Sequence, residues 1–300
     1  MVVATVTGSS RGIGRAIALQ LADDGMDIAL NDVQAQLSEL QAVKAEIEKK
    51  GRKAATFVAD VSNEEQVEKM IVDIVAEFGE LNVMVANAGI FIPKSILEVS
   101  VAEWDRIMAI NVRGVYLCYR EAGKRHSSSE ALFRVASISQ YPAKQMIKQG
   151  KGGKMVAACS TAGYRPSASH SAAYTTSKWA VRGLTQTAAV EFAKYDINVN
   201  AYCPGPVDTD MWKIIDADIA AREGLEKGVA FKRSVEARAA LKRAQDPEDL
   251  ANLVSFLVSS KARNITGQSV LCDGGEIHPS PFPHAHSLSV TAPRCVIGQS

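Results

Sequence analysis

The sequence predicts an α/β protein built on a parallel sheet. Short runs rich in β-branched residues alternate with longer stretches whose apolar residues have helical spacing, which is typical of βαβ units. Some short runs, such as Val83–Ala86, are almost continuously apolar, as expected for a strand covered on both faces. A glycine-rich turn directly after the first run favours a dinucleotide-binding version of this architecture.

The first hundred residues alternate regularly between the two kinds of segment. Strands are predicted at 2–6, 27–31, 54–58 and 82–86, and helices at 13–22, 36–50 and 64–78. A long helix is predicted from about residue 101 to 119, followed by a strand at 154–159, the helix that carries Tyr174, and a strand at 197–203. Pro247 opens a further helix, because the N–H that it lacks is not needed in a first turn, and 269–272 is the last predicted strand.

The composition is that of a soluble globular protein. The chain has 300 residues, of which 47% are hydrophobic and 22% charged, and its net charge is +1. It has neither a basic run nor the roughly 18 consecutive apolar residues of a membrane helix, so we expect no nucleic-acid partner and no membrane span. The start of the chain lacks the layout of a signal peptide, and five scattered cysteines without a CxxC motif fit reduced thiols, so we expect a cytoplasmic location.

A predicted phosphate loop joins the first strand to the first helix. Gly8, Gly12 and Gly14 have the spacing G-x-x-x-G-x-G, which differs from the commoner G-x-G-x-x-G. Glycines allow a tight turn and a close approach to a ligand, and the helix N-terminus offers free N–H groups to a pyrophosphate. The alternative is a plain turn, but the position between strand and helix favours a dinucleotide site.

Two residues of opposite charge affect the choice of nucleotide. Asp32 ends the second strand, where a carboxylate can accept hydrogen bonds from a ribose 2′-OH and would repel a 2′-phosphate. Arg11 favours the opposite choice, since a basic side chain in the loop could meet a 2′-phosphate. We give Asp32 more weight because contact and repulsion act together, so NAD(H) is the favoured cofactor and NADP(H) the alternative.

Tyr174 and Lys178 form a candidate acid–base pair. They lie four residues apart in a predicted helix, and therefore on one face of it. A neighbouring ammonium favours the phenolate, so it would lower the tyrosine pKa from roughly 10 toward working pH, as the proton donor of a carbonyl reductase requires. The spacing alone is a weak signal, and a solvated surface pair is the alternative.

In combination, Gly8-x3-Gly12-x-Gly14, Asn87-Ala88-Gly89, Ser160 and Tyr174-x3-Lys178 resemble the short-chain dehydrogenase/reductase family. The resemblance extends from residue 2 to about 275 and includes Pro204-Gly205. It implies a single domain with a doubly wound (Rossmann) sheet of seven parallel strands in the order 3-2-1-4-5-6-7, with helices on both faces. It also implies a homotetramer or dimer that forms on the long helices.

The resemblance assigns roles residue by residue. Tyr174 would be the general acid in reduction and Lys178 would lower its pKa and hold the nicotinamide ribose. Ser160 would hydrogen-bond the substrate carbonyl, and Asn111 would hold a water in the proton relay. An ordinary strand-end hydroxyl is the alternative for Ser160, and a buried helix-bending residue is the alternative for Asn111. Asn in mid-helix among apolar neighbours is unfavourable, which supports the functional interpretation of Asn111.

The position of the serine departs from the family pattern. Ser160 precedes Tyr174 by 14 residues, one or two more than is usual, and Thr161 would fit the shorter spacing. We choose Ser160 because it directly follows the fifth strand, and the loop 164–171 can hold the extra residue. The predicted cofactor contacts are Gly8, Ser10, Arg11, Gly12, Ile13, Gly14, Asp32, Asp60, Val61, Asn87, Ala88, Gly89, Tyr174, Lys178, Pro204, Gly205, Val207 and Thr209. The predicted substrate contacts are Ser160, Tyr174 and Trp212, and no metal is expected.

Several segments look most like those of acetoin/diacetyl reductases, that is, 2,3-butanediol dehydrogenases. They are residues 182–188, 202–205, 211–212 and 266–269. They imply an NAD(P)-dependent oxidoreductase acting on a small ketone or secondary alcohol, such as diacetyl, acetoin or 2,3-butanediol, beneath a lid of about residues 211–244. The alternatives are a 3-oxoacyl or polyol/sugar reductase of the same family, and a dinucleotide-binding protein without turnover. The presence of Ser160, Tyr174, Lys178 and Asn111 argues against a protein without turnover.

Two segments do not fit the family pattern. Residues 123–142 interrupt the long helix, and their removal joins the apolar positions Val112, Val115, Tyr119, Ala122 and Met146 into one helical stripe. After Gly275, prolines and the histidines His278, His284 and His286 predict a disordered tail over 276–300 in preference to a metal site. Retained introns translated in frame are one hypothesis for both segments, and a genuine surface insertion is the alternative. We expect an intact active site and a weakened helix–helix subunit contact.

Overall fold

The fold is a parallel sheet between two layers of helices. The computed structural model describes residues 2–123, 142–166 and 170–277. The seven strands are β1 (Val3–Thr7), β2 (Asp27–Asp32), β3 (Ala54–Val58), β4 (Val83–Ala86), β5 (Gly153–Ala158), β6 (Ile197–Pro204) and β7 (Ser269–Cys272). Their order in the sheet is β3-β2-β1-β4-β5-β6-β7, with every neighbouring pair parallel, so the predicted doubly wound architecture is confirmed.

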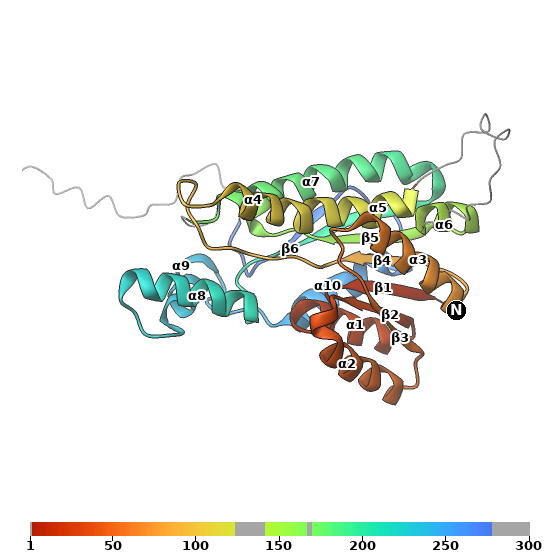
Figure 1. Ribbon diagram of the computed structural model, residues 1–300, viewed down its shortest axis with the longest axis horizontal. Coiled ribbons are helices and arrows are strands. Elements are labelled where there is room, and N and C mark those ends of the chain that lie inside the picture. Colours follow the sequence, from red (N-terminus) through yellow and green to blue (C-terminus); the bar gives the residue numbers. More distant parts are fainter. Residues whose placement is uncertain (1, 124–141, 167–169, 278–300) are drawn as a thin grey trace, which may run out of the picture.

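Helices cover both faces of this sheet (Figure 1). One face carries α1 (Gly12–Asp23), α2 (Leu37–Lys49) and α10 (Pro247–Val258). The other face carries α3 (Glu64–Phe78), α4 (Val101–Met108), α5 (Gly114–Gly123), α6 (Pro142–Gln149) and α7 (Ala172–Phe192). Two further helices, α8 (Asp210–Glu223) and α9 (Val229–Arg238), stand apart from both layers and pack against each other.

Each face of the sheet has its own apolar core, because a parallel sheet with crossover helices is buried on both sides. Ile71 and Ile74 of α3 belong to one core, and Ile17 and Leu21 of α1 belong to the other. All four side chains are fully buried. Burial of each such side chain contributes about 1.5–3 kcal/mol, so these cores rigidly fix the strand ends on which the site is built.

The predicted long helix is present, with one irregular turn. The helices α4 and α5 are joined by η2 (Ala109–Arg113), a π-helical segment that places Asn111 in a widened turn. Such single π turns are frequent at functional sites. Pro247 lies in the first turn of α10, as predicted, and Asp246 caps that helix.

The two atypical segments have different outcomes. Helix α5 ends at Gly123 and α6 begins at Pro142, so most of the predicted insertion 123–142 lies outside the described residues and remains a prediction. Met146 of α6 is fully buried in the same core as Val115 and Tyr119 of α5. The predicted start of the tail at residue 276 is wrong, because Glu276 is buried and the N–H of Ile277 donates to Asp273 Oδ2 at 2.8 Å. The tail beyond, from His278 to Ser300, lies outside the described residues.

The part of the chain that the structure describes contains neither a candidate membrane-spanning helix nor a candidate metal site. None of its helices has both the length and the apolar character that crossing a membrane requires. Within residues 2–123, 142–166 and 170–277, no three His, Cys, Asp or Glu side chains are grouped closely enough to hold a metal ion. The tail histidines, at positions 278, 284 and 286, are not among these residues.

Candidate active site

A cleft of about 850 Å³ opens at the carboxyl ends of the strands. It is lined by the loops that follow β1, β2, β3, β4, β5 and β6, and by residues of α4, α7, α8 and α9. All but two of the predicted site residues line it. The exceptions are Ser10 and Asn111, which are buried and hold neighbouring groups in place.

The glycine loop at one end of the cleft is shaped for close approach. Gly8 and Gly12 have φ values of +64° and +53°, which favour glycine. A Cβ on Gly14 would lie 2.1 Å from the carbonyl oxygen of Gly8, so only glycine fits there. No side chain of the described residues caps the N-terminus of α1, which leaves its N–H groups available to an anion such as a pyrophosphate.

Asp32 closes the same end of the cleft. Its Oδ2 accepts hydrogen bonds from the N–H and the hydroxyl of Ser10, at 3.2 and 2.6 Å. Ser10 therefore supports Asp32, and its predicted contact with the cofactor remains a prediction. Asp60 and Val61 line the neighbouring wall, and Arg11 lies at the mouth of the cleft with Nη1 3.7 Å from Asp210 Oδ2. The Arg11–Asp210 pair is exposed, so it contributes little to stability.

Asn87 ties the glycine loop to the strands beside it. Its Nδ2 donates to the carbonyl oxygens of Thr7 and Gly8, at 2.7 and 3.1 Å. Its Oδ1 accepts a hydrogen bond from the Tyr202 hydroxyl at 2.6 Å, which reaches across from β6. Tyr202 was not predicted as a site residue, because a tyrosine in a strand gives no sign of where its hydroxyl will point.

Tyr174, Ser160 and Lys178 meet in the middle of the cleft. Tyr174 and Lys178 are on α7. Ser160 lies two residues beyond the end of β5 and caps η3 (Thr161–Gly163) by accepting from the Ala162 N–H at 3.1 Å. The Ser160 side chain lies near enough to the Tyr174 phenol to act on its pKa, and Ser160 and Thr161 both line the cleft. The choice of Ser160 over Thr161 remains a prediction. Phe91, a cleft residue that was not predicted, packs edge-on against the Tyr174 ring at 5.0 Å between ring centres.

The electrostatics of the pair differ from the prediction. Burial raises the pKa of Tyr174 to about 12, although the nearby Ser160 side chain acts in the opposite direction. Lys178 was expected to lower the phenol pKa. Instead, its Nζ donates to the carbonyl oxygen of Ala158 at 2.8 Å and lies 5.3 Å from the centre of the Tyr174 ring. Burial also lowers the pKa of Lys178. The phenol is therefore held in its protonated form, which is the form that donates a proton.

Asn111 forms hydrogen bonds with the segments next to Tyr174 and Lys178. Its side chain is fully buried, accepts from the Ile90 N–H at 2.9 Å and donates to the Ile90 carbonyl at 3.0 Å. It also donates to the hydroxyl of Ser177 at 3.1 Å, next to Lys178 in the sequence. These bonds join η2, α7 and the loop after β4. Asn111 thus positions the backbone around Lys178, and its predicted role in a proton relay remains a prediction.

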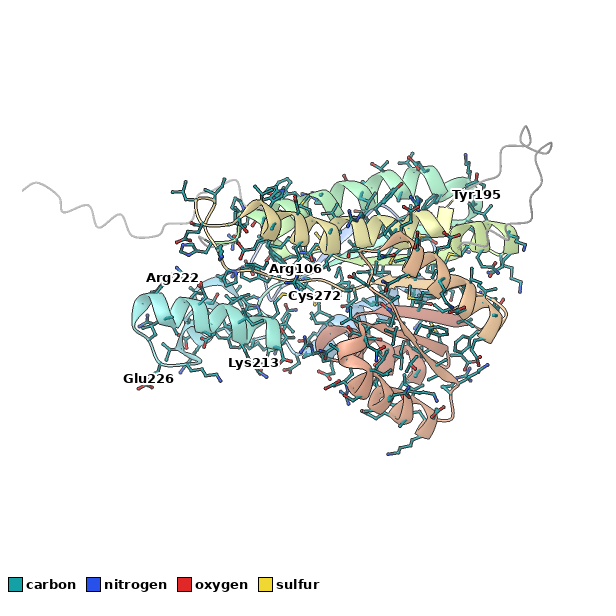
Figure 2. All side chains as sticks on the ribbon, in the orientation of Figure 1. Arg106, Tyr195, Lys213, Arg222, Glu226 and Cys272 are labelled. Carbon is teal, nitrogen blue, oxygen red and sulfur yellow. The ribbon has the colours of Figure 1, made fainter. Side chains whose placement is uncertain are left out.

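The far wall of the cleft comes from the loop after β6 and from α8. Pro204, Gly205, Val207 and Thr209 line it, and Trp212 packs against Phe231 of α9 at 5.2 Å between ring centres. Arg106 of α4 and the α8 residues Lys213 and Arg222 also line the cleft (Figure 2). Lys213 and Arg222 form ion pairs with Asp210 and Asp218 respectively. These cations were not predicted, because their positions depend on how α4 and α8 face each other.

The lining residues fit a dinucleotide. The glycine loop admits a close backbone approach, and Asp32 offers a carboxylate at the second strand end. Gly89 is similarly restricted, because a Cβ there would lie 3.3 Å from Asn111 Oδ1 and 3.7 Å from Lys178 Nζ. A narrow cradle that runs from Asp32 past the glycines to Tyr174 matches an elongated ligand with a central pyrophosphate.

Comparison with known proteins gives a consistent result. The sequence profile of the short chain dehydrogenase family matches residues 2–220. A short-chain dehydrogenase/reductase of Armillaria gallica is 46% identical over 91% of this chain and 95% of its own length. A diacetyl reductase [(S)-acetoin forming] of Staphylococcus epidermidis is 41% identical over 92% of this chain and 98% of its own. A 3-oxoacyl-[acyl-carrier-protein] reductase of the same species is 34% identical over 91% of this chain and 97% of its own length.

Solved structures agree with this result. The crystal structure of acetoin dehydrogenase from Enterobacter cloacae superposes with a TM-score of 0.74 and 31% identity, over 94% of this chain and 98% of that one. The matches span nearly the whole chain, including the glycine loop and the Tyr174–Lys178 pair. The chain therefore belongs to the short-chain dehydrogenase/reductase family and is an NAD(P)-dependent oxidoreductase.

Proposed function

We propose that the protein reduces a small vicinal diketone or hydroxyketone, such as diacetyl or acetoin, and oxidises the corresponding alcohol. The observation that carries the proposal is that Ser160, Tyr174 and Lys178 line the same cleft together. The substrate class is supported by the 41% identity to a diacetyl reductase over 92% of the chain. Trp212 and Phe91 give this part of the cleft apolar walls that suit a small uncharged ketone.

The residues divide the work of reduction. A bound nicotinamide supplies a hydride to the carbonyl carbon. Ser160 and the Tyr174 phenol both donate hydrogen bonds to the carbonyl oxygen, where negative charge develops. Tyr174 then transfers its proton to that oxygen, which completes the alcohol. The Lys178 ammonium, held by Ala158, stabilises the phenolate that remains.

The proposal is tested by following the ultraviolet absorbance of the reduced nicotinamide with a panel of carbonyl substrates. We expect turnover with diacetyl and acetoin, and much weaker turnover with xylulose. Preferred turnover of an acetoacetyl thioester would instead favour a 3-oxoacyl reductase, which the 34% identity to such an enzyme makes the second candidate. Tight cofactor binding without turnover of any carbonyl would contradict both.

We infer that NAD(H) is the preferred cofactor. The inference is supported by Asp32, which lines the cleft at the end of β2 and whose carboxylate is held in place by Ser10. We expect higher kcat/KM with NADH than with NADPH. Asp32→Asn should narrow that preference about tenfold or more, because it removes a like-charge repulsion against the 2′-phosphate. An unchanged preference in the variant would contradict the role of Asp32.

We infer a cytoplasmic homotetramer or dimer. Among the described residues, Cys159, Cys203 and Cys272 form no disulfide, as suits a reducing compartment. Tyr116 and Trp179 are exposed on α5 and α7, which supports subunit contact through the long helices. Segment 123–142 enters at the end of α5, away from the cleft, so we expect it to weaken this contact. Size-exclusion chromatography of the full chain and of a version without 123–142 tests this, and a stable tetramer of the full chain would contradict it.

A further inference from the structure

Glu276 is a buried carboxylate at the far end of the described chain. Its side chain is 1% exposed, which is rare for glutamate unless it is paired. The turn before it is rigid, because Asp273 accepts hydrogen bonds from the N–H groups of Gly275 and Ile277, at 2.9 and 2.8 Å. The position of Glu276 is therefore determined by the backbone and by the contacts of its side chain.

One oxygen of Glu276 joins two segments that are distant in sequence. Its Oε1 accepts hydrogen bonds from the Arg238 guanidinium, through Nε at 2.9 Å and through Nη2. The same oxygen accepts from Arg165 Nη2 at 3.2 Å. Arg238 is the last residue of α9, and Arg165 lies just beyond η3, the short helix that Ser160 caps. The carboxylate thus links the lid helices to the loop next to the catalytic serine.

Arg238 carries this link into the cleft. It lines the cleft, and its guanidinium carbon lies 6.0 Å from the centre of the Trp212 ring. Trp212 in turn packs against Phe231, so Arg238, Trp212 and Phe231 form one continuous contact between α8 and α9. We call these three residues the lid wall. Glu276 holds the lid wall in place through its hydrogen bonds with Arg238.

The second oxygen of Glu276 faces the loop after β6. Oε2 is buried and has no hydrogen-bond partner among the described residues. A Cβ on Gly205 would lie 3.1 Å from this oxygen, so Glu276 packs directly behind a residue that lines the cleft. The carboxylate therefore touches two walls of the cleft, although it does not line the cleft itself.

We propose that Glu276 is a positioning residue that holds the lid wall against the substrate end of the cleft. Removal of its charge leaves two partly exposed guanidinium groups without their buried anion, which weakens the charge-assisted hydrogen bonds that hold them. Arg238 would then turn toward water, and the lid wall would loosen. The consequence is weaker substrate binding with little change in the proton and hydride transfers, because Ser160, Tyr174 and Lys178 are held by other contacts.

The kinetic test compares Glu276→Gln with the wild type. Glutamine has the same shape but no charge, and we expect KM for diacetyl to rise about tenfold or more, as for the loss of a charge-assisted hydrogen bond, with kcat changed less than about twofold. NADH affinity should not change. Glu226→Gln is the matched control, because Glu226 is an exposed carboxylate in the lid region (Figure 2) and should leave KM unchanged. A KM that does not rise in Glu276→Gln, or a fall in kcat alone, overturns the proposal.

A second readout does not depend on turnover. Trypsin can cut the lid after residues such as Lys213, Lys227 and Arg233, and mass spectrometry identifies the cut. We expect faster cleavage there in Glu276→Gln than in the wild type or in Glu226→Gln. Equal cleavage rates overturn the proposal. The kinetic readout rests on the proposed function, whereas the trypsin readout decides the role of Glu276 even if the wild type turns over no carbonyl.

A second variant guards against a folding failure of Glu276→Gln. Arg165 is 41% exposed, so Arg165→Ala removes one of the bonds to Oε1 without burying an unpaired group. We expect the same changes in KM and in lid cleavage, smaller than those in Glu276→Gln, because the bonds from Arg238 remain. An Arg165→Ala protein with wild-type KM and wild-type lid cleavage contradicts the link between the two segments.

Discussion

The two ends of the cleft are held together by different kinds of interaction. The nucleotide end depends on backbone shape, with positive φ at Gly8 and Gly12 and no room for a Cβ on Gly14. The substrate end depends on side-chain charges, and Arg165 and Glu276, which meet there, are 111 residues apart in the sequence. Backbone shape tolerates almost no substitution, whereas an ion pair can be weakened in steps. The comparison therefore predicts that substitutions at the nucleotide end abolish cofactor binding abruptly, whereas substitutions at the substrate end weaken substrate binding by degrees.

The largest expected effect lies between the two ends, at Tyr174. Tyr174→Phe removes the proton donor and should lower kcat by a factor of about 10² to 10⁴, the usual contribution of a general acid. Cofactor affinity, measured by fluorescence titration with NADH, should stay nearly unchanged, because the ring and its contact with Phe91 remain. Retained turnover in this variant would contradict the proposed mechanism.

At the nucleotide end, the addition of a single methyl group to Gly14 should abolish cofactor binding. Gly14→Ala forces a Cβ to within 2.1 Å of the Gly8 carbonyl oxygen, so the loop must shift. We expect a loss of cofactor binding and a destabilisation of about 1–3 kcal/mol or more, measured by titration and by urea unfolding. Gly183→Ala is the matched control, since nothing lies within 4 Å of a Cβ at that helical position. There, alanine should stabilise α7 by up to about 1 kcal/mol. If the two variants had the same cofactor affinity and the same free energy of unfolding, the shape of the glycine loop would not determine either property.

A smaller loss is expected where a side chain supports the glycine loop. Tyr202→Phe removes the hydroxyl that donates to Asn87 Oδ1, a partly buried acceptor at the cleft. Loss of this hydrogen bond should lower the free energy of unfolding by about 0.5–1.5 kcal/mol and should also lower cofactor affinity. Calorimetry of NADH binding provides the measurement, with KM for diacetyl as the internal comparison. A change in the substrate KM alone would place Tyr202 at the other end of the cleft.

The smallest effect is a dependence of stability on alkaline pH. The Tyr174 pKa is raised in the folded protein from its ordinary value of 10.0 to about 12. The unfolded chain therefore loses this proton first, and stability that is fully present below pH 10 is lost as pH rises toward 12. Urea unfolding across this range should show a steeper decline in the wild type than in Tyr174→Phe. A parallel decline in both proteins would mean that Tyr174 is not the group responsible.

Most of the fold and much of the site could be predicted from local patterns. The alternation of strands and helices indicated a parallel sheet, and the family resemblance supplied the strand order. Glycine spacing placed the phosphate loop, and the four-residue spacing placed Tyr174 and Lys178 on one face of α7. These features depend on residues that are near one another in the sequence. The hydrogen bond from Ser10 to Asp32 was not predicted, because it joins residues that are 22 positions apart in the sequence.

The amino-acid sequence by itself determined the architecture, the glycine loop after β1 and the placement of Tyr174 and Lys178 on one helix, because periodicity and glycine spacing act over a few residues. The tertiary structure decided which polar groups meet. It brought Tyr202 to Asn87, Asn111 to Ser177, and two arginines to Glu276, which sequence patterns had assigned to a disordered tail. It also set the raised pKa of Tyr174, because burial depends on everything that covers the phenol. Charges and hydrogen bonds across the cleft are long-range contacts, and local patterns carry no information about them.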